Sequence, residues 1–108
     1  MPFYLYQMTY SKDAAKGMVA APSDRRAAAA KMVGSVGGTL HHMFFAFGTY
    51  DVVALIEAPS DAAMAAGALL IGASGAASGA STTKLLTMDE AAEAIRLAAK
   101  GSYSPPMG

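Results

Sequence analysis

Apolar side chains recur along this chain with two different periods, and the changes between them mark the predicted elements. Four runs rich in aromatic or β-branched residues predict strands, at residues 3–10, 39–47, 50–58 and around 79–86. Helical spacing is clearest between the first two runs, where an apolar stripe has the i, i+3, i+4, i+7 pattern and comprises Ala29, Met32, Val33 and Val36. Helices are also expected at residues 12–20, at 60–71 and at 89–100.

Polar residues and glycines set the expected helix ends. Ser11 and Ser23 are positioned as N-caps of the first two helices, since a serine oxygen accepts a free backbone N–H. Gly37 and Gly38 end the second helix, because glycine tolerates a left-handed backbone. Residues 87–90, Thr-Met-Asp-Glu, have the form of a capping box and begin the last helix.

The element order predicts an α+β fold. Strand, helix, strand, strand, helix, strand is the ferredoxin-like βαββαβ pattern, a four-stranded antiparallel sheet with its helices on one face. The last helix is an extra C-terminal element. We expect a single domain over residues 1–100 and an extended tail over 101–108.

Gly48 and Thr49 predict a two-residue type II′ turn, which fixes the register of the central hairpin. Phe45 then lies opposite Val52, His41 opposite Ile56 and Leu40 opposite Glu57. The apolar set of the third strand comprises Tyr50, Val52, Ala54, Ile56 and Ala58, and we expect it to face the helices. The opposite face then carries Val53 and Leu55 with no helix to cover them.

An exposed apolar face of this kind indicates a partner surface. The same face of a second copy, related by a two-fold axis, is the simplest cover. A ligand pocket is expected between the two sheets, or between a sheet and its helices. Composition agrees with self-association, because 25 Ala and 11 Gly among 108 residues leave a core of small side chains.

The charge balance excludes several classes of partner. Eight basic and eight acidic residues provide no field for nucleic acid, and Arg25 and Arg26 are expected on a solvated helix face. The chain has no cysteine, which excludes disulfides and thiolate chemistry. Residues 62–83 are uncharged but rich in Ser and Gly, so no membrane span is expected. With no signal-peptide pattern at the start, we expect a cytoplasmic protein.

The third strand and the turn before it carry a family resemblance. The run Phe-Gly-Thr-Tyr-Asp-Val-Val at residues 47–53, continuing to Glu57-Ala58-Pro59, is similar to the signature of GYD-domain proteins. Pro2 with Tyr4, Tyr10-Ser11, Gly37-Gly38 and Ser60-Asp61 add weaker matches, whereas residues 75–79 differ from the polar start of the last strand usual in that family. The resemblance implies a dimeric α+β barrel and no settled activity.

Candidate functional residues gather on the hairpin and the first strand. His42 lies diagonal to Glu57 in the expected register, so a base oriented by a carboxylate is the catalytic candidate. The expected ligand-binding residues are Gln7, His42, Phe44, Tyr50, Asp51 and Glu57. Each also has a purely structural interpretation as a packed or hydrogen-bonded group. His41 and His42 are expected on opposite faces, so no metal site and no cofactor is predicted.

Three functions remain open from the sequence. The leading interpretation is a dimer-based homo-oligomer that binds a small, largely apolar molecule in a pocket lined by the sheet. The alternatives are a cofactor-free oxygenase or isomerase and an assembly module without a ligand.

Overall fold

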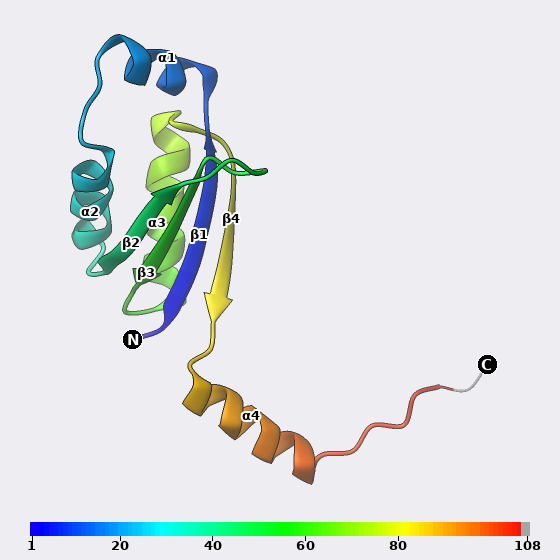
Figure 1. Cartoon of the computed structure of the whole chain (residues 1–108). Coiled ribbons are helices and arrows are strands. Elements are labelled where there is room, and N and C mark those ends of the chain that lie inside the picture. Colours follow the sequence, from blue (N-terminus) through cyan, green and yellow to red (C-terminus); the bar gives the residue numbers. More distant parts are fainter. Residues whose placement is uncertain (107–108) are drawn as a thin grey trace.

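A four-stranded antiparallel sheet with two covering helices forms the body of the protein. The structure is a computed structural model that describes residues 1–106. The strands are β1 (Phe3–Tyr10), β2 (Thr39–Phe45), β3 (Val52–Glu57) and β4 (Ala77–Leu85), and the helices are α1 (Lys12–Ala20), α2 (Arg25–Ser35), α3 (Asp61–Ser74) and α4 (Met88–Lys100). The spatial order β2-β3-β1-β4 confirms the ferredoxin-like arrangement (Figure 1).

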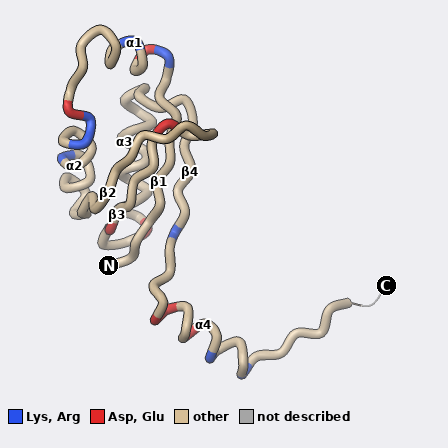
Figure 2. The backbone as a smooth tube through the Cα atoms, viewed as in Figure 1, with Lys and Arg blue, Asp and Glu red and all other residues tan. Residues whose placement is uncertain are grey.

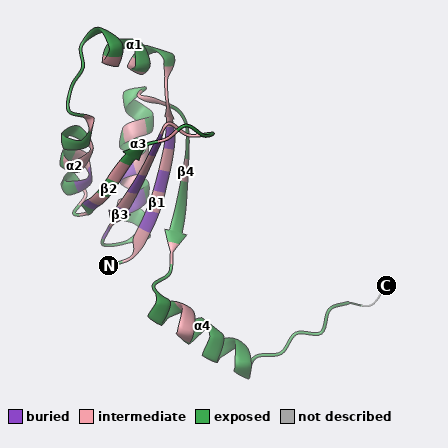
Figure 3. Ribbon diagram, in the orientation of Figure 1, coloured by how far each residue is buried: buried purple, intermediate pink, exposed green. Residues whose placement is uncertain are grey.

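The core lies between one face of the sheet, the inner face, and helices α2 and α3. Alternate residues of the two central strands are buried on this face: Val52, Ala54 and Ile56 from β3, as the sequence pattern predicts, and Tyr4, Tyr6 and Met8 from β1. Val33 of α2 and Met64 of α3 pack against them. Burial is confined to the sheet and to the helix surfaces that face it (Figure 3).

Side-chain oxygens begin the helices by accepting backbone N–H groups near the N-terminus. Ser11 accepts from Ala14 N, and Ser60 accepts from Ala63 N, both at 3.1 Å. The expected cap of the second helix at Ser23 is wrong by one residue, because the Asp24 carboxylate accepts from Ala27 N at 2.9 Å. A carboxylate at this position also interacts favourably with the helix dipole.

The connection between β2 and β3 differs from the predicted two-residue turn. A type II′ turn needs a positive φ at Gly48, and in the described chain only Gly37 and Gly75 have one. The last hairpin hydrogen bond joins Ala46 N to Asp51 O, and the strands end at Phe45 and Val52. Neighbouring β1 provides the reason, since Asp51 N donates to Met8 O and the Thr9 hydroxyl donates to Thr49 O.

Helix α4 projects away from the body of the protein (Figure 1). Its capping box is formed as predicted, with Thr87 and Glu90 each accepting from the other's backbone N–H. None of its residues is buried, and Met88 and Ile95 are 84% and 71% exposed. Residues 101–106 have no regular secondary structure, and the remainder of the expected tail, 107–108, lies outside the described residues.

Candidate functional site

The face of the sheet opposite the helices, here called the outer face, is the largest candidate surface. No helix of residues 1–106 covers it, and apart from Gln7 its central side chains are apolar and half-buried or exposed. They are Phe3 and Leu5 of β1, Phe44 of β2, and Val53 and Leu55 of β3. Phe44 is 64% exposed. The uncovered apolar face that the hairpin pattern predicts is therefore present in the single chain.

A β-bulge between Leu40 and His42 changes the predicted register at one end of the hairpin. His42 pairs with Leu55 as expected, but Leu40 pairs with Ile56 and Thr39 with Glu57. The predicted pairs of His41 with Ile56 and of Leu40 with Glu57 are therefore wrong. The extra residue lets Leu40 turn inward, where it is buried in the core.

The bulge places His41 beside Glu57 on the outer face. His41 Nε2 lies 2.9 Å from Glu57 Oε1, and the imidazole ring lies 5.6 Å from the ring of Phe3. His42 instead stacks on Phe44 at 6.1 Å and is exposed. The expected contact of His42 with Glu57 is replaced by one from His41, because the inserted residue shifts which histidine reaches the carboxylate.

Three further predicted site residues lie at separate places on and around the sheet. Gln7 lies at the centre of the outer face, between Val53 and Ser81 of the neighbouring strands. Asp51 accepts from Tyr10 N at 3.0 Å, so it ties the hairpin loop to β1. Tyr50 is half-buried in the same loop. These residues line the outer face and one of its ends, and they do not form one cluster.

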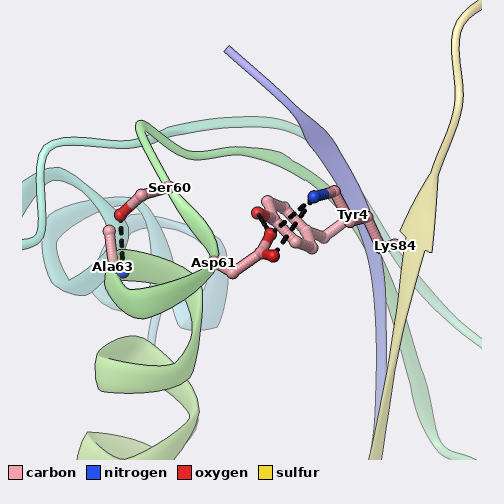
Figure 4. A network of polar contacts seen from close by, with 5 residues as sticks. All are labelled: Tyr4, Ser60, Asp61, Ala63 and Lys84. Atoms are coloured by element: carbon pink, nitrogen blue, oxygen red, sulfur yellow. Dashed lines mark hydrogen bonds and ion pairs between the residues drawn. The ribbon is translucent and has the colours of Figure 1, made fainter. Parts of the chain in front are cut away.

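A polar network that the sequence analysis did not single out lies on the helix side of the sheet. The Tyr4 hydroxyl donates to Asp61 Oδ1, and Lys84 Nζ lies 3.0 Å from the same carboxylate oxygen (Figure 4). Burial, and then the hydrogen bond to Asp61, raises the pKa of Tyr4 to about 12. The bonds from Tyr4 and Lys84 hold the pKa of Asp61 below its usual range.

This network lies at one end of an open groove between α3 and β4. The groove has a volume of 570 Å³. Its walls are mainly small or apolar side chains, namely Met64, Ala65, Ala68 and Leu69 of α3. Only the tertiary fold brings these groups together, since β1, the start of α3 and the end of β4 are far apart in sequence. The alternating pattern of β1 places Tyr4 on the same face as Tyr6 and Met8 and gives no signal for its two partners.

Two other classes of site find no support in the described part of the chain. No three acidic or histidine side chains of residues 1–106 lie together as metal ligands. No described helix has the length and apolar composition needed to cross a bilayer. Basic and acidic residues are distributed over the body in small groups, with the basic ones concentrated on α1 and α2 (Figure 2).

The comparison with known families agrees with this geometry. No protein of curated function matches the sequence. The family model of the GYD domain matches residues 4–95, which include all of the sheet except Phe3, helices α1 to α3 and the first part of α4. A match over most of the 108 residues settles the assignment, and the chain belongs to the GYD domain family.

Proposed function

We propose that this protein is a dimer-based homo-oligomer that binds a small, largely apolar molecule. The bare outer face carries this proposal. The apolar side chains on this side of the sheet lose their unfavourable contact with water when a second sheet covers them. A two-fold axis lets the same residues serve on both sides of the contact.

The ligand in this proposal lies between the stacked sheets, against residues of the outer face and its rim. The proposed contacts are Gln7, His42 and Phe44, and Glu57 and the pair Tyr50 and Asp51 form the two opposite rims of the site, one at each end of β3. Gln7 offers an amide among apolar neighbours, and Phe44 offers an exposed ring. A mostly apolar lining with a few polar groups is typical of small-molecule sites.

The mass of the protein in solution tests the dimer. Sedimentation equilibrium at micromolar concentration is expected to give twice the 11.0-kDa chain mass. Leu55→Lys is expected to give the monomer, because the two-fold axis places two unpaired charges in the covered interface. Val19→Lys is the matched control, since Val19 lies exposed on α1, away from the sheet.

Circular dichroism on both variants establishes that they are folded. A wild-type monomer, or a Leu55→Lys protein that remains dimeric, overturns the proposed assembly through the outer face.

A further inference from the structure

Arg25 departs from the solvated position that the sequence pattern predicts for it. It is the first residue of α2 and is only partly exposed, because its side chain reaches over the ring of Tyr10, with 5.9 Å from the guanidinium carbon to the ring centroid. Its Nε is buried and has no hydrogen-bond partner. Arg25 also forms no salt bridge within residues 1–106.

The neighbouring Arg26 provides a contrast within the same helical turn. It is exposed, as predicted, and its guanidinium donates to His41 O at 3.4 Å. A buried N–H without an acceptor is costly, and a guanidinium without a carboxylate lacks its usual partner. Arg25 therefore presents a guanidinium that has no carboxylate partner within residues 1–106.

An open groove with a volume of 330 Å³ lies beside Arg25, between α2 and α3 and against β1 and β2. Apolar side chains from four elements form most of its wall: Met8, Met32, Met43, Leu70 and Ile71. Tyr10 and Ser74 also line it, but the Ser74 hydroxyl already donates to Ile71 O at 2.6 Å. A tyrosine hydroxyl is protonated at neutral pH, and burial raises the pKa of Tyr10 further above its usual value.

We propose that this groove binds a small monocarboxylate with an apolar body, whose carboxylate pairs with the guanidinium of Arg25. A single unpaired guanidinium favours a ligand with a single negative charge. The methionine and aliphatic side chains of the wall can contact an apolar body. Asp51 does not compete for the guanidinium, since it accepts from Tyr10 N and forms no salt bridge with Arg25. This site lies on the helix side of the sheet, so it is separate from the ligand site proposed above on the outer face.

Benzoate and its neutral counterpart benzyl alcohol are the probes, followed by amide chemical shifts of the full chain. Benzoate is expected to shift amides of Met8, Met43 and Ile71, and benzyl alcohol to bind more weakly. Arg25→Gln is expected to weaken benzoate binding by roughly tenfold or more, the usual loss for a charge-assisted hydrogen bond, and to change benzyl alcohol binding little. Arg25→Lys keeps the positive charge but lacks the guanidinium. Its affinity for benzoate is expected to lie between those of the wild type and Arg25→Gln.

Arg26→Gln is the matched control and is expected to bind benzoate like the wild type. An equal loss in Arg26→Gln indicates a general charge effect and overturns the proposed site, as does unchanged binding in Arg25→Gln or the absence of shifts with benzoate. Shifts confined to Gln7, Phe44 and Leu55 overturn this site and leave the proposed function in place, because they put the ligand on the outer face. The mass measurement with Leu55→Lys is independent of every one of these outcomes.

Discussion

Glu57 pairs with His41 and not with His42, at 2.9 Å between Oε1 and Nε2, because β2 contains one residue more than its partner strand. Both groups remain partly exposed, with 36% of the His41 side chain and 25% of the Glu57 side chain accessible. Solvent therefore screens the interaction, and the pair contributes little to the stability of the fold. Its main effect is to hold two polar groups in place at the edge of the outer face.

A double-mutant cycle measures this pair. The coupling between His41→Ala and Glu57→Ala in the free energy of unfolding is expected to be below about 1 kcal/mol, as for other partly exposed pairs. The matched cycle of His42→Ala with Glu57→Ala is expected to show no coupling, because His42 stacks on Phe44. A coupling at His42 that equals or exceeds the one at His41 contradicts the bulged register.

Gly38 lies where α2 turns into β2, and a side chain does not fit there. A Cβ at this position would lie 2.7 Å from Glu57 O and 3.0 Å from Val33 Cγ1. Gly38→Ala is therefore expected to destabilise the protein by about 1–3 kcal/mol, since a backbone carbonyl in a sheet moves only at a cost. Urea unfolding measures the change.

Gly34→Ala is the matched control for Gly38→Ala. A Cβ at Gly34 meets nothing within 4 Å, and the residue lies within α2. Alanine there is expected to stabilise by about 0.5–1 kcal/mol through helix propensity. Equal effects of the two substitutions contradict the close approach of Gly38 to β3.

The hydrogen bond from Tyr4 to Asp61 predicts a pH dependence of stability. The pKa of Asp61 is lowered in the folded protein, chiefly by Tyr4 and then by Lys84, so the ionised carboxylate stabilises the fold. That contribution is present above the ordinary aspartate pKa of about 4 and is lost as the pH falls through the folded value. Tyr4→Phe is expected to raise the pKa of Asp61 and to reduce the stability lost between about pH 7 and about pH 3.

Carboxyl chemical shifts of Asp61 and urea unfolding at the two pH values measure these effects. Tyr6→Phe is the control, because Tyr6 is equally buried and has no bond to a carboxylate. An unchanged pKa of Asp61 in Tyr4→Phe, or the same change in Tyr6→Phe, contradicts the assigned cause.

Loss of the capping box is expected to reduce the helical content of α4 and to leave the stability of the sheet unchanged. A helix of 13 residues with no buried side chain is marginal, so loss of a cap worth about 1 kcal/mol is expected to reduce its helical content. Thr87→Ala is expected to lower the helical chemical shifts of residues 88–100 and to leave the unfolding of the sheet unchanged. Ser60→Ala removes the equivalent cap of α3, which packs on the core, and is expected to lower the global stability by about 1 kcal/mol. Equal global losses in the two variants contradict the separation of α4 from the body.

Much of the fold follows from local patterns in the sequence. The alternation in β1 and β3 identifies the residues that face the helices, because a strand places every second side chain on one side. The caps at Ser11, Ser60 and Thr87 and the helix end at Gly37 depend only on residues within one turn. The bulge at His41 and the shape of the 46–51 loop depend on hydrogen bonds to other strands, which no local pattern records.

The sequence by itself determined the order of the elements, the inner face of the sheet and the absence of a helix to cover its outer face. Those features follow from side-chain periodicity along single elements, where burial of apolar surface dominates. Tertiary structure alone decided which histidine meets Glu57 and that Tyr4, Asp61 and Lys84 form one network. It also decided that Arg25 lies beside an open groove with no carboxylate partner in residues 1–106. Each of these contacts joins residues from different elements. Its geometry depends on the relative placement of those elements to within about an ångström, and local sequence patterns do not specify that placement.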